Sequence, residues 1–232
     1  MRLRLAFGLA TLVLITAGCS STAPTPAPTA STARVSTPDT TGQAEREAAF
    51  WARRNADRQR FTQADVDFMT GMIGHHAQAL IMAAMAPTHG ASPELQTLAA
   101  RIDNAQKAEI ATMQNWLRIR GQPVPEVHIE GTHLMIHGPG GHMNHGDHMM
   151  PGMLTQAQLD ELDAARGPEF DRLFLTYMIG HHSGAVTMVE DLFATDGGAQ
   201  EDDAFKLASD IQVDQRTEIA RMHRMLDARS AD

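Results

Sequence analysis

Cysteine is nearly absent from this sequence, since its 232 residues include only one, Cys19. A single cysteine cannot form an internal disulfide, so the fold must be stabilised by a packed core instead of covalent cross-links. Cationic residues are also scarce, 19 against 28 acidic ones, and the formal net charge is −9. Because nucleic-acid binding depends on a basic surface, we expect no nucleic-acid partner.

Aromatic residues make up only 5% of the chain, whereas there are 15 methionines and 12 histidines. Thioether and imidazole groups are soft and borderline metal ligands, so this ratio favours metal binding. Motifs of enzymes are scarce. There is no glycine-rich phosphate loop, and the only Glu-x-x-His spacing, Glu130 to His133, falls in a segment that also contains glycine. The sequence therefore predicts a binding protein and not an enzyme.

The longest apolar run near the start, Leu5 to Ile15, is too short to span a membrane comfortably. Arg2 and Arg4 precede it and small residues follow it, which is the layout of a signal peptide over residues 1–18. Cys19 would then become the first residue after cleavage and is a predicted lipidation site. The segment resembles a bacterial lipobox, although Thr16 stands where an aliphatic residue is usual.

These features predict an exported protein that is lipid-anchored to the cell envelope, on the periplasmic side or the outer cell surface. An ordinary signal peptide with an incidental cysteine is the alternative, and it also exports the protein. Residues 19–43 are rich in Ser, Thr, Pro and Ala and predict a disordered tether after the lipidated cysteine. We assign residues 44–232 to a helical bundle domain.

Helix start and stop signals divide this domain. Thr62 with Asp65, Ser92 with Pro93, and Thr155 with Gln158 are typical helix starts. They predict helices over 63–86 and 92–120 and a short helix that ends at Gly167. Further helices are expected over 44–58, 169–194 and 202–228. No segment gives a convincing strand pattern.

An internal repeat is visible in the sequence. FMTGMIGHHAQALIM at 68–82 matches FLTYMIGHHSGAVTM at 174–188, and the segment at 98–117 matches that at 207–226. Each repeat, about 60–120 and 155–228, is thus one helical hairpin. Two hairpins that cannot bury their apolar stripes alone predict an all-α four-helix bundle with an approximate twofold axis.

The repeated motif places polar groups on core-facing stripes. On a helical wheel the adjacent histidines of each MIGHH motif straddle the apolar stripe, and a glutamate lies in the middle of each partner stripe. Buried imidazoles and carboxylates need a partner or a metal. The predicted metal ligands of the bundle are His75, His76, His181, His182, Glu109 and Glu218, with Met72 and Met178 beside them. Copper, zinc, iron and manganese suit this set about equally, and a metal-free polar network is the alternative.

A segment rich in Gly, His and Met lies between the repeats, at about 124–153, and holds half of the histidines. Imidazole and thioether together match copper in both oxidation states. The predicted ligands here are His133, His137, His142, Met143, His145, His148 and Met149. A flexible linker that binds any divalent metal weakly is the alternative reading.

The two MIGHH blocks, joined by a segment that ends in MPGML, resemble the bacterial domain-of-unknown-function family three hundred and five over about residues 60–228. The resemblance implies an exported ferritin-like bundle, with copper binding and copper tolerance assigned to some relatives. Carried over to this sequence, the implied copper binding rests on His75, His76, His181 and His182, with the intervening Met/His segment as a second site. In repeat two Tyr177 and Gly184 replace Gly71 and Gln78, so the halves need not bind equally.

The sequence therefore predicts an extracytoplasmic copper-binding lipoprotein that sequesters copper, gives copper tolerance or passes copper to other copper-handling proteins. Two alternatives stay open: a redox enzyme with an iron or manganese centre, and a structural envelope protein without metal.

Overall fold

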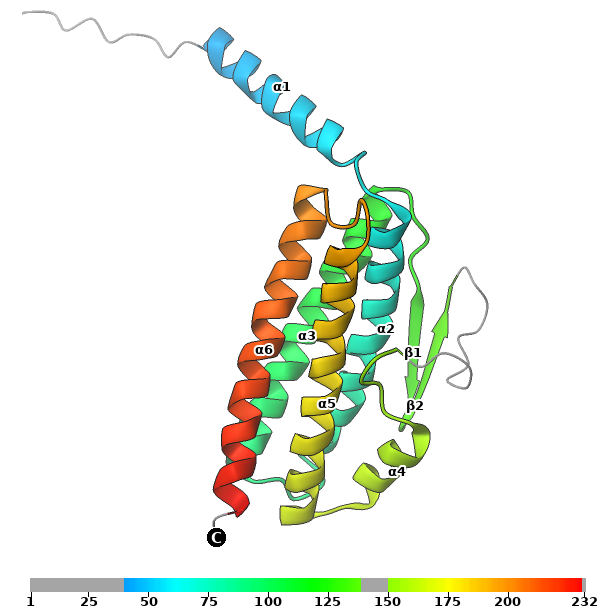
Figure 1. Cartoon of the computed structure of the whole chain (residues 1–232), viewed down its shortest axis with the longest axis vertical. Helices are drawn as coiled ribbons and strands as arrows, with labels where there is room; N and C mark the ends of the chain where they lie inside the picture. The colour runs from blue at the N-terminus through cyan, green and yellow to red at the C-terminus, as the bar shows by residue number, and fades with distance from the viewer. Residues whose placement is uncertain (1–39, 139–149, 231–232) are drawn as a thin grey trace, which may run out of the picture. The chain divides into compact units, whose positions relative to one another are not determined.

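Four long helices form the centre of the structure, a computed structural model that describes residues 40–138 and 150–230 (Figure 1). These helices are α2 (Gln63–Met85), α3 (Pro93–Ile119), α5 (Gly167–Ala194) and α6 (Asp202–Ser230). The other elements are α1 (Thr40–Asp57), the strands β1 (Glu126–Glu130) and β2 (His133–His137), and the short helix α4 (Gln156–Ala164). The chain divides into two units, residues 1–40 and 41–232, and the four long helices and both strands lie in the second.

The predicted helix starts are confirmed by their capping contacts. The Thr62 amide donates to the Asp65 carboxylate at 2.8 Å before α2, and the Ser92 hydroxyl accepts from the Leu95 amide at 3.4 Å before α3. Thr155 and Gln158 form the same kind of reciprocal pair before α4. Such caps satisfy backbone groups that the first turn of a helix leaves without a partner. The sequence thus sets where these helices begin.

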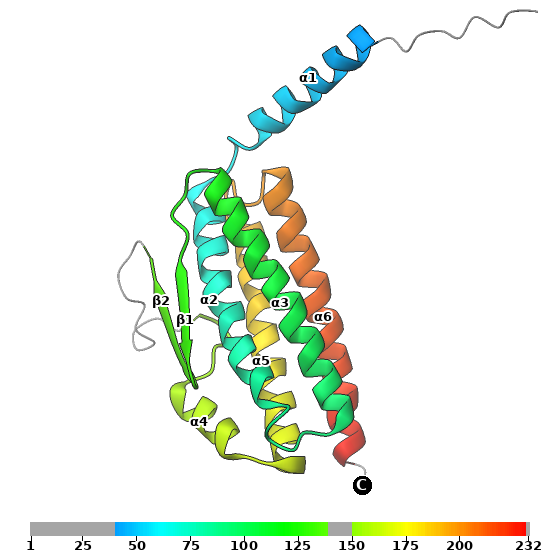
Figure 2. The same ribbon diagram turned by 180° about the vertical axis from the view of Figure 1, so that it is seen from behind.

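The predicted pairing of the helices is also confirmed: α2 packs on α3, α5 packs on α6, and the two hairpins meet through α2 and α5. Large side chains such as Phe170, Phe174, Met69 and Leu117 are fully buried between them. This apolar burial is the main stabilising term for a chain without disulfides. Figure 2 shows α3 and α6 on the side of the bundle away from the strands.

The prediction that the chain has no strand is wrong for residues 126–137. β1 and β2 form an antiparallel hairpin in which Glu130 faces His133 across a two-residue turn. Leu134 and Ile136 are buried, whereas His133, Met135 and His137 are exposed. This alternation is the strand period of two, and it fixes which face of the hairpin covers the bundle.

The repeat is also visible in the arginine contacts that join the two hairpins. The repeat aligns Arg120 with Arg229. Arg120 directly follows α3, and Arg229 lies in the last turn of α6. Arg120 pairs with Glu201 just before α6. Arg229 donates to the Ser92 hydroxyl at 2.6 Å and to the Asp171 carboxylate at 2.7 Å. Each arginine therefore joins the end of its own hairpin to a helix start in the other half.

Among the described residues, no helix combines the length and the apolar character needed to cross a bilayer.

Candidate metal centre

The two MIGHH motifs meet in the interior of the bundle. All four imidazoles, two from α2 and two from α5, have no solvent exposure. The rings of His75 and His181 lie closest, with centroids 3.9 Å apart and planes tilted by 38°. Centroids of the adjacent rings are 6.4 Å apart in the first motif and 6.2 Å apart in the second. The structure thus brings together four of the predicted site residues, while their metal-binding role stays a prediction.

Three of these imidazoles are held by acceptors at Nε2. His76 lies 2.7 Å from the Glu109 carboxylate, and His182 lies 2.7 Å from the Glu218 carboxylate. His75 lies 2.9 Å from the Pro151 carbonyl oxygen. Carboxylates and carbonyls accept hydrogen bonds, so the proton of each ring is assigned to Nε2. The opposite nitrogen, Nδ1, then carries a lone pair.

Those lone pairs have no partner within the part of the chain that the structure describes. Nδ1 is buried without a hydrogen bond in each of the three rings, and His181 has neither ring nitrogen paired. A metal-bound histidine usually has this geometry, because its second nitrogen donates to a carboxylate or a carbonyl that fixes the ring. The donor set therefore fits a metal that prefers nitrogen ligands.

Burial favours the neutral form of three of these rings, those of His75, His181 and His182. Desolvation, aided by the neighbouring His76, lowers the pKa of His75 to about 3. Desolvation also lowers the pKa of His181, with His75 acting in the same direction. For His182, desolvation lowers the pKa although the Glu218 carboxylate opposes the shift. Neutral imidazole is the form that binds metal ions, so these three rings do not need to lose protons near pH 7.

The predicted role of the two glutamates as metal ligands stays a prediction. Glu109 and Glu218 each give one oxygen to an imidazole, and their side chains are 14% exposed. They are placed to orient the rings. Among the residues that the structure describes, no three His, Cys, Asp or Glu side chains are close enough to hold one ion together. Ligation of one ion by three of these side chains therefore requires the rings to move.

The predicted thioether ligands lie deep in the core. Met72 and Met178 are fully buried, each one helical turn before the second histidine of its motif. Both belong to the apolar clusters that stabilise the bundle. The structure therefore shows that both methionines pack in the core, and their role as metal ligands stays a prediction.

The predicted loop ligands fall into two groups. His133 and His137 lie on the exposed face of β2, and His128 faces Met135 across the hairpin. Because this face points away from the bundle, His133 and His137 do not join the buried imidazoles. The remaining predicted ligands, His142, Met143, His145, His148 and Met149, lie outside the described residues.

Sequence reasoning missed the segment Met150–Leu154, which closes the centre on one side. The Gln78 side chain pairs with both backbone groups of Leu154, at 2.9 Å and 2.7 Å. Gly184 permits a close approach, since a Cβ there would lie 1.9 Å from the Pro151 carbonyl oxygen. Glycine within a helix often marks such a contact, so Gly184 was the available signal.

The other side of the centre is a small polar cavity between α3 and α6. Its volume is about 140 Å³, and it is lined mainly by Arg101, Gln106, Glu109, Asp214, Gln215 and Glu218. Burial raises the pKa of Asp214, and the carboxylates of Glu109 and Glu218 add to this effect. Acidic groups thus gather directly outside the imidazole pairs.

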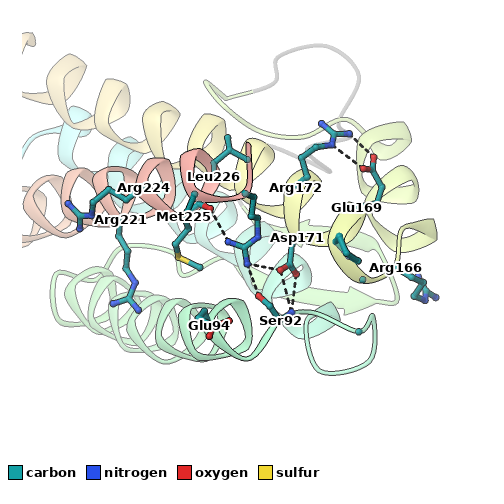
Figure 3. Close-up of a pocket in the computed structure, with 15 residues that line it drawn as sticks. Ser92, Glu94, Arg166, Glu169, Asp171, Arg172, Arg221, Arg224, Met225 and Leu226 are labelled. Atoms are coloured by element: carbon teal, nitrogen blue, oxygen red, sulfur yellow. Dashed lines mark hydrogen bonds and ion pairs between the residues drawn. The ribbon is translucent and has the colours of Figure 1, made fainter. Parts of the chain in front are cut away.

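A larger hollow of about 1370 Å³ lies at the end of the bundle where α6 ends and α3 and α5 begin. Figure 3 shows Ser92 and Asp171 together within it. Two of its arginines are paired with carboxylates within it, Arg229 with Asp171 at 2.7 Å and Arg172 with Glu169 at 2.6 Å, and the described residues that line it include no histidine. We therefore assign the candidate centre to the buried histidines.

Comparison with solved structures identifies similar proteins. A DUF305 fragment from Deinococcus radiodurans shares 30% identity at a TM-score of 0.58, with 72% of this chain and 98% of that chain covered. A DUF305 protein of Streptomyces coelicolor, described as secreted, shares 25% identity at a TM-score of 0.56, covering 72% and 92%. CopM in its Cu(II)-bound form shares 33% identity at a TM-score of 0.53, covering 71% and 96%. CopM is also known in Cu(I)-bound and silver-bound forms.

No curated protein matches the chain significantly. The family model described as "Domain of unknown function (DUF305)" matches residues 65–226, which contain both hairpins. This match confirms the resemblance that the MIGHH motifs predict. The chain belongs to the DUF305 family.

Proposed function

We propose that this protein binds copper outside the cytoplasm and sequesters it or passes it on, without catalysing a reaction. The observation that carries the proposal is the set of four fully buried imidazoles with unpaired Nδ1 atoms at the contact between α2 and α5. Burying unpaired polar nitrogens costs about 1 to 3 kcal/mol each, so a bound ion would offset a real penalty.

Two observations favour copper over the other candidate metals: the kinds of ligand that copper prefers, and the metals that relatives of this chain bind. Imidazole alone suits zinc, copper and iron, but methionine thioethers select copper. CopM, with 33% identity, binds Cu(II), and its Cu(I)-bound and silver-bound forms share 30% identity with this chain. Silver(I) is a soft ion with the same ligand preference as copper(I). Other copper-handling proteins are then the natural partners for transfer.

Export and lipid anchoring belong to the same proposal. A secreted relative from Streptomyces coelicolor supports a place outside the cytoplasm. The lipid anchor rests on the signal-peptide layout that ends at Cys19.

Metal competition tests the function. The full-length protein is exposed to equimolar copper, zinc, iron and manganese, dialysed, and analysed for bound metal. We expect copper to be retained above the other three. Loss of all copper on dialysis sinks the proposal.

A double variant, His76→Gln with His182→Gln, tests the location of the site. Glutamine keeps an N–H donor for Glu109 and Glu218, so the fold should persist, while both Nδ1 lone pairs are lost. We expect the variant to retain less copper than the wild type. His223→Gln, an exposed position on α6, is the matched control. If the wild type and the double variant retain the same amount of copper, the copper site does not lie at these histidines of the bundle.

A further inference from the structure

The buried imidazoles raise the question of how an ion reaches them, since none is exposed to solvent. On the side of the bundle that faces the strands, backbone and side-chain atoms pack closely against the rings. The Pro151 carbonyl oxygen lies 2.9 Å from His75, and a Cβ at Gly152 would lie 2.9 Å from the His181 carbonyl oxygen. Ile136 of β2 lies so close to Gly74 that a Cβ there would be 2.4 Å away. These contacts leave no room for an added atom, so the described residues pack tightly over this side of the rings.

The opposite side is open as far as the glutamates. α3 and α6 approach each other at few points, and the cavity of about 140 Å³ lies between them. Glu109 and Glu218 line this cavity and also hold His76 and His182 at 2.7 Å. They are the only described side chains that both line the cavity and bond to these histidines. The cavity thus ends at the two glutamates that hold these rings.

Two glutamine side chains show that the cavity is built to hold something polar. Gln106 and Gln215 line it with exposures of 1% and 2%. Neither amide atom of Gln106 has a hydrogen bond within the described residues, and the oxygen of Gln215 also has none. Buried amides without partners are rare in stable proteins because they are costly. Both sit one helical turn before the glutamates, at matching positions of the repeat.

The charge and the donor types define what fits. Three carboxylates, Glu109, Asp214 and Glu218, face the cavity with Arg101 as the single cation. Carboxylate and amide oxygens are ligands for divalent cations that keep part of their water shell. The volume has room for an ion with several waters, at about 30 Å³ per water. An ion held through water also agrees with the spacing of the carboxylates, which do not converge tightly.

We propose that the cavity between α3 and α6 captures a partly hydrated divalent cation and is the entrance through which it reaches the buried imidazoles. This inference rests on the proposed copper binding. The carboxylate mouth attracts the ion and raises its rate of arrival, since charged clefts speed association by about tenfold or more. The glutamine oxygens replace part of its water, and the ion then passes to the imidazole nitrogens.

The test is the rate at which the full-length protein takes up Cu(II), followed by stopped-flow absorbance of the copper–imidazole bands. The phase that belongs to the buried rings is the one that His76→Gln with His182→Gln abolishes. Ala105→Phe places a ring at the cavity wall. Ala111→Phe puts the same ring at another exposed position of α3 and is the matched control. Asp214→Asn removes one charge from the mouth.

We expect Ala105→Phe to slow the buried phase about tenfold or more and Asp214→Asn to slow it about threefold at low salt. Added salt should shrink the effect of Asp214→Asn, because it screens the carboxylate. Ala111→Phe should follow the wild type. If Ala105→Phe and its control load at the same rate, the entrance lies elsewhere while the copper function stands. If no phase is lost in the histidine double variant, the buried copper site itself is wrong.

Discussion

At the scale of single residues, the two copies of the motif differ where the Met150–Leu154 segment docks. Gln78 holds the backbone of Leu154, whereas its counterpart Gly184 leaves room for the Pro151 carbonyl. Both residues at this one aligned position therefore serve the same contact. The halves of the centre become unequal because only one side of the pseudo-symmetric bundle receives this segment.

Gly184→Ala should destabilise the protein strongly. The new Cβ would lie 1.9 Å from the Pro151 oxygen and 2.7 Å from the Gly152 Cα, and both are backbone atoms that cannot move alone. We expect a loss of about 2 to 4 kcal/mol in the free energy of unfolding, measured by urea denaturation. Gly180→Ala is the matched control on the same helix, because a Cβ there meets nothing within 4 Å. That change should be neutral or stabilise by about 0.5 to 1 kcal/mol. Equal effects of the two changes would contradict the docking argument.

The buried imidazoles also make stability depend on pH. The folded protein keeps the pKa of His75 at about 3 and lowers the pKa of His181 and His182. Between about pH 6.5 and 3, the unfolded chain therefore binds protons that the folded chain does not. Their contribution to stability is complete above pH 6.5 and is lost as the pH falls, by about 1.4 kcal/mol per pH unit for each such group.

Urea unfolding of the metal-free protein between pH 6.5 and 5 measures this slope, since ordinary carboxylates titrate mainly below that range. His75→Leu should reduce the slope by about 1.4 kcal/mol per pH unit. The exposed His223→Leu serves as the control and should leave it unchanged. A free energy of unfolding that stays constant across this window would show that the rings accept protons inside the fold.

At the scale of helices and strands, the sequence predicted those features that neighbouring residues determine, such as helix starts. The caps at Thr62, Ser92 and Thr155 predicted three helix starts, because side-chain oxygens satisfy the first backbone amides. The strands at 126–137 were missed, since the many histidines there suggested a metal-binding loop. The alternation of buried Leu134 and Ile136 with exposed neighbours was present, but a two-strand hairpin depends on the bundle beneath it.

The two arginine contacts that join the hairpins should differ in strength. Arg120 and Glu201 are both fully buried, and Arg120 also lies 4.3 Å from the centre of the Trp116 ring. Arg120→Met leaves Glu201 buried without its cation, so we expect a loss of about 3 to 5 kcal/mol in the free energy of unfolding.

The repeat supplies the matched variant. The Asp171 side chain is only 3% exposed, but Arg229 is 27% exposed and both residues line the larger hollow at this end of the bundle, so Arg229→Met should cost less, about 1 to 2 kcal/mol. Thermal or urea unfolding of both variants measures the difference. Equal losses would mean that burial does not control the strength of these contacts.

At the scale of the whole molecule, the two sides of the bundle differ. The strand hairpin, α4 and the Met150–Leu154 segment cover α2 and α5, whereas α3 and α6 enclose the polar cavity (Figures 1 and 2). The sequence predicted that four imidazoles share one interior, because the repeat and the helical period can both be recognised within short segments of the chain. It did not predict which side is closed, because Gln78 and Leu154 lie 76 positions apart.

The proposed lipid anchor of this protein rests on Cys19, the one cysteine of the chain. If Cys19 carries lipid, the acyl chains contribute about 0.8 kcal/mol per buried CH₂ group and hold the protein at a membrane. Cys19→Ala should then move the protein from the detergent phase to the aqueous phase in detergent partitioning of cell extracts. Ser20→Ala, the adjacent position, is the control and should stay with the membrane fraction. Copper retention should be equal in both variants, because the buried imidazoles lie far along the chain from Cys19. An aqueous wild-type protein would leave export without an anchor as the correct reading of the signal sequence.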